Sequence, residues 1–216
     1  MRKEKLDELR KYIEELKTIR KSLVPSEYIY DENNRPIKRN GFLDVERYEI
    51  ELANGKVVLR EKILKGGKDP SAAIVMPLTV DDNTVLVVQS RSSTEESVCV
   101  EFPAGYIEDG EAPEIGGARE VTEETGYIPE KMILLDKFYQ DQSCGVGAYN
   151  YSYLALGCSK ARQQKLDDNE AIRYFECSID EAIELMEQGY MTDIQSKYTL
   201  SLAKTYLKEK KNYKNN

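Results

Sequence analysis

The sequence contains no histidine, and its four cysteines are widely spaced with no CxxC pair. The missing histidine excludes catalytic triads and general bases that rely on an imidazole. The cysteine pattern argues against a structural zinc site and a disulfide framework, so we expect reduced, partly buried thiols. Acid–base chemistry must therefore come from carboxylates, Lys, Tyr, Cys or metal-bound water.

Long hydrophobic runs are also missing from this chain of 216 residues. No apolar segment approaches the roughly 18 residues that a membrane-spanning helix needs. The charged start MRKEKLDELRKYIEEL contains no apolar signal-peptide core, so we expect a cytoplasmic protein with no membrane partner. A net charge of −8 and a pI near 4.9 give no overall electrostatic footprint for nucleic acid.

The first 24 residues have leucine and isoleucine at helical spacing between charged residues. This pattern predicts an amphipathic helix that ends at Val24-Pro25. Pro, Asn and Gly turn signals over residues 25–41 predict a linker or an irregular loop. From Phe42 the hydrophobic period changes to two, which predicts β-strands.

The order of the remaining predicted elements indicates the fold class. We expect hairpins that turn at Asn54-Gly55 and at Asp81–Asn83, strands at 97–103, 132–139, 149–157 and 171–177, a loop over 104–112, and helices at 113–125, 179–188 and 192–209. This order predicts an α/β (α+β) sandwich rather than a doubly wound fold. The expected regions are a helix and linker at 1–41, a hairpin extension at 42–66, the main domain at 67–211 and a flexible tail at 212–216.

The segment from Gly105 to Tyr127 reads GYIEDGEAPEIGGAREVTEETGY and contains seven carboxylates among its 23 residues. At about 100° per residue, Glu120, Glu123 and Glu124 share one face of the predicted helix. The opposite face is expected to pack against the protein and consists of Ile115, Ala118, Val121, Thr122 and Thr125.

Three like charges at this spacing repel one another, so a positive group is expected to compensate them. Carboxylates are hard oxygen donors, and with no histidine or CxxC nearby the natural counter-charge is Mg²⁺ or Mn²⁺. Mg²⁺ usually keeps waters and binds substrate phosphates, so the cluster predicts one half of a phosphate site. The glycine pair Gly116-Gly117 lies one turn before Glu120 and is expected to leave room for a diphosphate or a neighbouring strand.

The same segment matches the pattern GX5EX7REUXEEXGU, in which U is a bulky apolar residue, with Tyr127 at the last position. This pattern is the signature of the Nudix hydrolases, and the chain resembles them without a gap. Such enzymes cleave a nucleoside diphosphate linked to another moiety, using a divalent metal and the attack of water on phosphorus. The resemblance implies a Nudix-type α/β/α sandwich with a mixed sheet, extended here by an N-terminal helix and a β-hairpin.

The signature from Gly105 to Tyr127 is here called the box, and the resemblance also implies roles for its residues. Glu120 and Glu124 become the principal metal ligands, Glu123 a further ligand or water-orienting group, and the carbonyl of Ala104 an additional metal ligand. All three glutamates are therefore counted among the catalytic residues.

Three other box positions are implied to hold the site together. Arg119 and Glu111 would form an ion pair between the loop and the helix, and Arg119 also counts among the substrate-binding groups. Gly126 would supply the backbone conformation that ends the helix.

Residues outside the box indicate which group of Nudix enzymes the chain resembles. The run from Glu101 to Gly105 (EFPAG) resembles the E-x-P-A-G run of ADP-ribose pyrophosphatase-like Nudix enzymes, and Gln89-Ser90-Arg91 is similar to their Q-x-R strand end. The resemblance places Arg91 and Glu101 at the substrate, with Arg91 on its diphosphate. In those relatives the N-terminal hairpin serves dimerisation, which implies a homodimer.

The stretch from Leu166 to Ile172 resembles the late acidic loop from which these enzymes draw a general base. Glu170 is the best match and Asp168 is the alternative. A charged turn before a strand remains the other interpretation of this stretch.

The resemblance implies a nucleoside diphosphate sugar such as ADP-ribose as the substrate, with a nucleoside monophosphate and a sugar phosphate as products. ADP-ribose-specific members usually have a Ser-Pro-Gly run where this chain has Ser143-Cys144-Gly145, so ADP-ribose itself stays open. Two alternatives are a pool-cleansing nucleoside triphosphate pyrophosphohydrolase and a catalytically silent Nudix module that binds a nucleotide.

Overall fold

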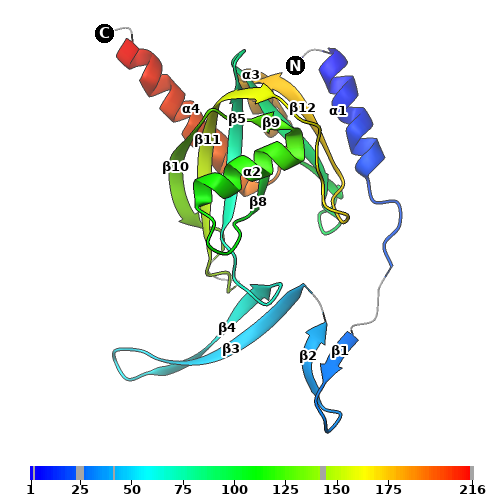
Figure 1. Ribbon diagram of the computed structural model, residues 1–216, viewed down its shortest axis with the longest axis vertical. Helices are drawn as coiled ribbons and strands as arrows, with labels where there is room; N and C mark the ends of the chain where they lie inside the picture. Colours follow the sequence, from blue (N-terminus) through cyan, green and yellow to red (C-terminus); the bar gives the residue numbers. More distant parts are fainter. Residues whose placement is uncertain (2, 23–26, 41, 142–144, 215–216) are drawn as a thin grey trace. The chain divides into compact units, whose positions relative to one another are not determined.

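A computed structural model describes residues 1, 3–22, 27–40, 42–141 and 145–214. Its contacts divide the chain into two units (Figure 1). The first unit, here called the body, contains Met1–Lys21, Ala72–Lys137 and Asn150–Asn216. The second unit, here called the extension, contains Ser22–Ser71 and Phe138–Tyr149. The region boundaries expected from the sequence stay a prediction.

The extension begins with a hairpin of strands β1 (Glu27–Tyr30) and β2 (Pro36–Asn40), where the sequence predicts an irregular loop. That prediction is wrong because the turn signals belong to the tip of the hairpin. There the Asp31 carboxylate accepts hydrogen bonds from the backbone N–H groups of Asn33 and Arg35, at 2.9 and 2.8 Å. This Asx arrangement is a typical way to close a tight turn.

The second hairpin of the extension confirms the strongest turn signal of the sequence. Strand β3 (Leu43–Glu51) pairs antiparallel with β4 (Val57–Lys65) along the full length of both strands. Gly55 has a φ of 78°, and its N–H donates to the carbonyl of Leu52 at 2.8 Å. A positive φ is easily adopted by glycine, which explains why Asn54-Gly55 predicts the turn.

The body is built around a mixed sheet with the strand order β10-β11-β5-β6-β12. These strands are β5 (Ala72–Thr79), β6 (Asn83–Ser90), β10 (Lys131–Tyr139), β11 (Tyr149–Lys160) and β12 (Ile172–Ser178). Strand β11 runs parallel to β5, whereas β6 pairs antiparallel with both β5 and β12. Three short strands pair antiparallel with this sheet, namely β7 (Val98–Glu101), β8 (Ala104–Tyr106) and β9 (Tyr127–Ile128). Strand β8 lies where the sequence predicts a loop, and β9 is not predicted at all.

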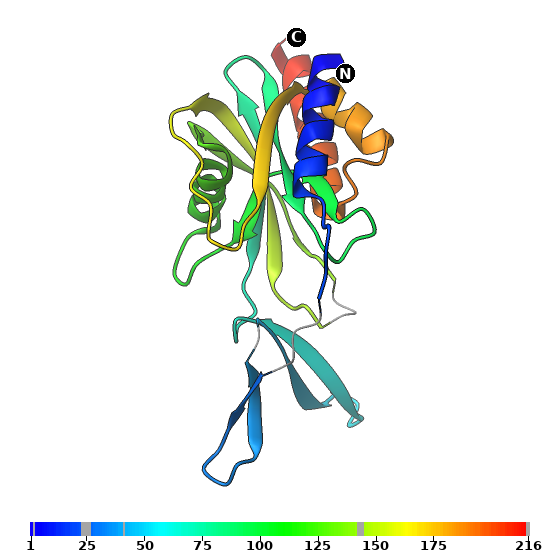
Figure 2. The same cartoon turned by 90° about the vertical axis from the view of Figure 1, so that its right-hand side faces the viewer.

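Helices cover both faces of the body sheet, which confirms the predicted α/β/α sandwich (Figure 2). Helix α2 (Pro113–Thr125) lies on one face. On the other face are helices α1 (Lys3–Leu16), α3 (Ile179–Glu187) and α4 (Ile194–Lys214). Between α2 and the sheet, a core forms around the fully buried side chains of Val75, Val85 and Val121. None of the helices in the described ranges is both long enough and apolar enough to cross a membrane.

Helix α1 packs on the body but is shorter than the sequence predicts. It buries Leu9 completely, and Lys5 forms an ion pair with Glu181 of α3 at 3.0 Å. The helix ends at Leu16 rather than at Val24, because the N–H of Thr18 donates to the Ser97 hydroxyl instead of to a helical carbonyl. The side chain of Ser97 therefore replaces the next helical hydrogen bond.

Candidate functional site

Helix α2 has the bounds that the sequence predicts, from Pro113 to Thr125. Proline suits the first helical position, where the missing N–H would have no helical partner. Gly126 ends the helix with a φ of 72° and donates its N–H to the carbonyl of Thr122 at 2.8 Å. The left-handed conformation at this position confirms the cap predicted for the box glycine.

The buried face of α2 differs from the predicted one. Its buried members are Gly116, Gly117, Val121, Glu124 and Thr125, and they include one of the three clustered carboxylates. Ile115, expected to pack, is 57% exposed. The helix is rotated so that its glycines face inward, which brings Glu124 into the protein.

The glycine pair explains this close approach of helix and sheet. A Cβ at Gly117 would lie 3.0 Å from Val75 Cγ2 and 3.3 Å from Ala73 Cβ, so this glycine leaves room for strand β5. A Cβ at Gly116 would lie 2.8 Å from a carboxylate oxygen of Glu111. The prediction of room for a neighbouring strand is thus confirmed at Gly117, whereas Gly116 accommodates the loop before the helix.

Arg119 connects the box residues. Its guanidinium forms the predicted ion pair with Glu111, at 3.1 Å from Nε to Oε1, and also donates to the carbonyl of Tyr106 at 2.9 Å. Its Nη1 lies 2.7 Å from Glu120 Oε1 and 3.0 Å from Glu123 Oε2. The hydrogen bonds with Glu111, and then with the other two carboxylates, raise the pKa of Arg119. One arginine therefore holds the loop and two of the three clustered glutamates.

Gly105 provides the space that the Glu120 carboxylate occupies. This glycine lies in β8 opposite Ala73 of β5. A Cβ at Gly105 would lie 2.1 Å from Cδ of Glu120, far inside van der Waals contact. The box glycine is therefore required by the position of a glutamate fifteen residues later in the chain.

Glu124 is the most deeply placed of the carboxylates, with 2% of its surface exposed. Its Oε2 accepts a hydrogen bond from the backbone N–H of Ala104 at 3.1 Å, which brings this predicted metal-binding residue to the same point. Burial, with the charges of Glu120, Glu170 and Glu101 adding to it, raises the pKa of Glu124 well above its usual value.

Arg91 directly follows the last residue of β6, and Glu101 is the last residue of β7, the antiparallel neighbour of β6. Arg91 Nε donates to Glu101 Oε1 at 2.7 Å, and Nη2 donates to the other oxygen of the same carboxylate. This bidentate pair raises the pKa of Arg91, and the charges of Asp193 and Glu124 raise it further. The sequence provided no reason to single out Asp193, which lies in the loop before α4.

Glu170 lies in the loop before β12, and its charge contributes to the raised pKa values of both Glu120 and Glu124. Its carboxylate accepts a hydrogen bond from the N–H of Asp167 at 3.0 Å, which holds the side chain over its own turn. Asp168 is exposed in the same loop. Of the two alternatives for a general base, Glu170 is the one with an electrostatic connection to the box glutamates.

The carboxylate oxygens gathered at this site are ligands that suit a hard divalent cation. Among the described residues, no group of three or more acidic or cysteine side chains already has the arrangement of a metal centre. Arg119 instead spans Glu120 and Glu123. Burial, with the charges of Glu123 and Glu170 adding to it, raises the pKa of Glu120 to about 7. Buried carboxylates that repel one another and present only oxygen fit Mg²⁺ or Mn²⁺.

These pKa shifts predict how the metal-free protein responds to pH. A folded-state pKa above the ordinary 4.5 means that the folded chain binds the proton more tightly than the unfolded chain. For Glu120 the resulting stability is present below pH 4.5 and is lost as the pH rises through about 7. In EDTA we therefore expect the Glu120 contribution, on the order of 1–3 kcal/mol, to disappear between pH 5 and pH 8.

Millimolar Mg²⁺ competes with protons for the same oxygens, so it should raise the Tm more at pH 8 than at pH 5. Circular dichroism melts at both pH values, with and without Mg²⁺, measure this difference. Wild-type protein is compared with Glu120→Gln, in which the difference should shrink. An equal Mg²⁺ effect at both pH values would contradict the expectation.

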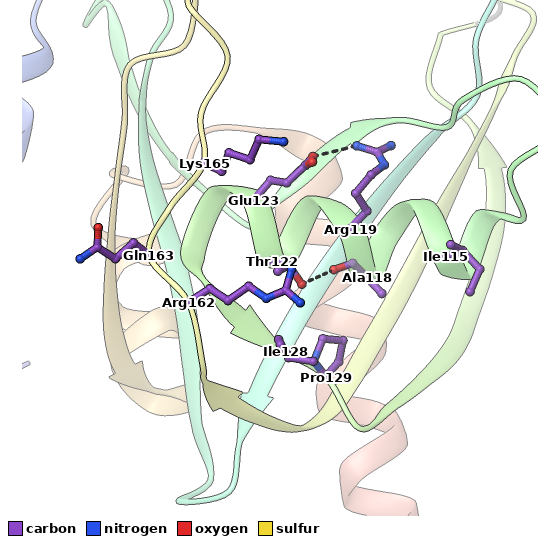
Figure 3. A pocket seen from close by; sticks show the side chains of 10 residues that line it. All are labelled: Ile115, Ala118, Arg119, Thr122, Glu123, Ile128, Pro129, Arg162, Gln163 and Lys165. Carbon is purple, nitrogen blue, oxygen red and sulfur yellow. Dashed lines mark hydrogen bonds and ion pairs between the residues drawn. The ribbon is translucent and has the colours of Figure 1, made fainter.

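An open pocket of about 410 Å³ lies beside this cluster, over the outward side of α2 (Figure 3). Its lining consists of Ile115, Ala118, Arg119, Thr122, Glu123, Ile128, Pro129, Arg162, Gln163 and Lys165. Arg119 and Glu123 belong both to the carboxylate cluster and to the lining of this pocket. The lining does not include Glu120, Glu124 or Arg91. The pocket is therefore adjacent to the chemistry that the carboxylates could perform and does not contain it.

The Ser143-Cys144-Gly145 run lies mostly outside the described residues. Only Gly145 is described, and its carbonyl accepts a hydrogen bond from the N–H of Ile63 at 3.0 Å within the extension. The substitution of cysteine for the usual proline therefore has no structural account.

Known proteins resemble this chain in both sequence and fold. Residues 68–197 match the NUDIX domain family. An ADP-ribose pyrophosphatase of Bacillus subtilis (strain 168) is 31% identical over 159 residues, which are 73% of this chain and 83% of that protein. A methanol dehydrogenase activator of Bacillus methanolicus is 34% identical over 146 residues, 67% of this chain and 76% of that protein.

A crystal structure of an ADP compounds hydrolase has the same fold, with a TM-score of 0.67 and 21% identity. The match covers 88% of this chain and 98% of the chain in that structure. The family match extends over the whole of α2 and the sheet that carries it, and it includes every box position discussed above. The chain therefore belongs to the Nudix family.

Proposed function

We propose that this chain is a Mg²⁺-dependent pyrophosphohydrolase that cleaves a nucleoside diphosphate sugar, with ADP-ribose as the first candidate. The products would be a nucleoside monophosphate and a sugar phosphate. The observation that carries the proposal is the convergence of Glu120 and Glu124 with Arg91, Glu101 and Glu170, in a chain that keeps every box carboxylate. The Bacillus subtilis relative named an ADP-ribose pyrophosphatase supports the choice of substrate class.

The cation would be held by Glu120, Glu123 and Glu124 together with the carbonyl of Ala104. When bound, it supplies charge neutralisation for the diphosphate and lowers the cost of activating water. Mg²⁺ is preferred over Mn²⁺ as the first choice because it commonly binds through a few carboxylates and substrate phosphates.

The side chains would divide the remaining work. Arg91, held by Glu101, binds the diphosphate and neutralises the charge that develops on it. Arg119 holds the carboxylates of Glu120 and Glu123 in place and borders the substrate. Glu170 accepts the proton of the attacking water as the new oxygen–phosphorus bond forms and the bond to the bridging oxygen breaks.

A product assay tests this function directly. The protein is incubated with Mg²⁺ and a panel of ADP-ribose, other nucleotide sugars, dinucleotides and nucleoside triphosphates, and the products are identified by mass spectrometry. A parallel reaction in EDTA is the control. We expect a monophosphate plus a sugar phosphate, with Mg²⁺ only. Pyrophosphate released from triphosphates would support the pool-cleansing alternative, and no product from any member would support a silent nucleotide-binding module.

We further propose that the working unit is a homodimer in which the β3–β4 hairpin contacts a second copy. Large apolar side chains on both faces of this hairpin are 39% to 57% exposed, namely Leu43, Val45, Tyr48, Ile50, Leu52, Val57 and Leu59. A lone two-stranded hairpin is only marginally stable, and an apolar surface of this kind usually marks an interface. A second copy of the same surface could cover it.

Light scattering during size exclusion measures the assembly. We expect a mass near twice 24.7 kDa for the wild type. The double variant Val45→Glu/Leu59→Glu should be monomeric, since the two residues lie on the same face of the hairpin. The matched control Glu49→Gln/Glu61→Gln removes charge from the same strands and should remain dimeric. A monomeric wild type at micromolar concentration would refute the proposal.

A further inference from the structure

The C-terminal end of helix α2 has charges of the wrong sign for a helix end. Glu123 and Glu124 lie in its last turn, and that turn has no basic residue. The last carbonyls of a helix carry partial negative charge and have no helical donor, so cations and N–H groups are favoured there. The helix that carries the carboxylate cluster therefore needs donors from another part of the chain.

A single segment, Lys160 to Lys165, supplies these donors and is here called the clamp. It donates to four successive carbonyls of the helix end. The bonds run from Lys165 N to Glu123 O at 2.8 Å, from Gln164 Nε2 to Glu124 O, from Lys160 Nζ to Thr125 O, and from Ala161 N and Arg162 N to Gly126 O at 3.1 and 3.0 Å. This complete set compensates the unfavourable charge of the last turn.

Gly126 allows the clamp to approach the helix. A Cβ at this position would lie 2.1 Å from the carbonyl oxygen of Arg162 and 2.8 Å from Lys160 Nζ. The box glycine therefore has two functions at once. It takes the left-handed conformation that ends the helix, and it leaves the space in which the clamp backbone lies.

Gln164 connects the helix end to the loop that carries Glu170. Its side-chain amide donates to the carbonyl of Glu124 and, at 3.5 Å, to the carbonyl of Ile172 at the start of β12. The N–H of the next residue, Lys165, is bonded to Glu123. The loop over residues 165–171 is thus fixed at both ends, and one glutamine amide contributes to both attachments.

We propose that Gln164 is a positioning residue that sets the distance between Glu124, on the metal-binding helix, and Glu170, on the neighbouring loop. The inference rests on the proposed function, because that function assigns the cation to Glu124 and the proton to Glu170. A shift of about 1 Å between such groups is enough to cost up to a hundredfold in rate. Loss of the amide should affect turnover more than substrate binding, since Gln164 is not among the residues expected to contact the diphosphate.

The test compares Gln164→Met with Gln163→Met. Methionine has nearly the length of glutamine but no N–H group, so it removes the two bonds while filling the same space. Gln163 is the exposed neighbour in the chain and lines the adjacent pocket, which makes its substitution a matched control. Turnover is measured under Mg²⁺ with the best substrate of the product assay. Hydrogen exchange and Mn²⁺ binding by electron paramagnetic resonance are measured on the same proteins without substrate.

For Gln164→Met we expect kcat to fall about tenfold or more, with KM within threefold of the wild type and the Tm lowered by only a few degrees by the loss of the two bonds. The N–H groups of Lys165 and Glu170 should exchange faster, and Mn²⁺ should bind several-fold more weakly. Gln163→Met should match the wild type in every measurement. A Gln164→Met variant with wild-type exchange and wild-type Mn²⁺ affinity would overturn the proposal, as would a loss of activity accompanied by a large drop in Tm.

These measurements separate the two proposals. If the wild type hydrolyses no member of the panel, the proposed function fails, while exchange and Mn²⁺ binding still decide the role of Gln164. If the wild type is active and Gln164→Met equals it in kcat, the positioning role fails and the proposed function is unaffected.

Discussion

Replacing Glu124 with glutamine is expected to lower kcat by about a thousandfold while leaving the chain folded. Loss of one preorganised charge-stabilising group already costs roughly 10²–10³ in rate. Glu124 is the most buried of the proposed metal ligands, so water cannot readily replace its carboxylate. Glutamine keeps the side-chain shape and an oxygen that can accept from the N–H of Ala104. What it removes is the negative charge that would hold the cation.

The stability of this variant should change in the opposite direction from its activity. Burial raises the pKa of Glu124, which means that the folded state disfavours its charged form. A neutral amide avoids that cost, so metal-free Glu124→Gln is expected to melt at or above the Tm of the metal-free wild type at pH 8. Mg²⁺, which should raise the Tm of the wild type, should raise that of the variant much less.

The matched control is Glu114→Gln, in the first turn of the same helix, where the side chain is exposed. It removes the same charge from the same helix and should retain nearly full activity. Initial rates over a range of Mg²⁺ concentrations, together with melts of each protein, measure both effects. A Glu124→Gln enzyme with more than a tenth of the wild-type kcat would refute the assignment of Glu124 as a metal ligand.

The sequence predicts helix α2 well because the information for a helix is local. The residues from Gly105 to Tyr127 predict the helix and its start at Pro113, and the resemblance to the Nudix enzymes implies the cap at Gly126 and the ion pair between Arg119 and Glu111; the structure has all of these. The apolar runs on either side of the turn at Asp81–Asn83 likewise predict strands β5 and β6, which support this helix and are buried on both faces. Both patterns depend only on neighbours a few residues apart, which is the range that a periodic signal covers.

What the sequence does not predict depends on contacts between distant segments. The helical period places Glu124 with Glu120 and Glu123 but does not reveal that Glu124 faces the sheet. That orientation follows from the contact of Gly117 with strand β5. The clamp is hidden for the same reason. Most of its donors are backbone N–H groups, which every residue except proline possesses, so no residue type marks them in the sequence.

Gly105→Ala is expected to lower kcat by about a hundredfold without a comparable loss of stability. The added Cβ would occupy the position of the Glu120 carboxylate, at 2.1 Å from its Cδ, so the carboxylate must move. The end of a glutamate side chain can rotate away at modest cost, and Gly105 is not among the glycines with positive φ. The backbone should therefore accept alanine, while the proposed metal ligand is displaced by more than the roughly 0.5 Å that a functional site tolerates.

A double-mutant cycle shows whether Glu120 transmits this effect. If alanine at position 105 acts by displacing the Glu120 carboxylate, then Gly105→Ala should cost nothing further in a Glu120→Ala background, where no carboxylate remains to be displaced. The kcat of the double variant should equal that of Glu120→Ala within about twofold. Additive losses would instead mean that Gly105 acts through the backbone of β8 next to Ala104. The cycle thus distinguishes a glycine that makes room for a ligand from a glycine that shapes the strand.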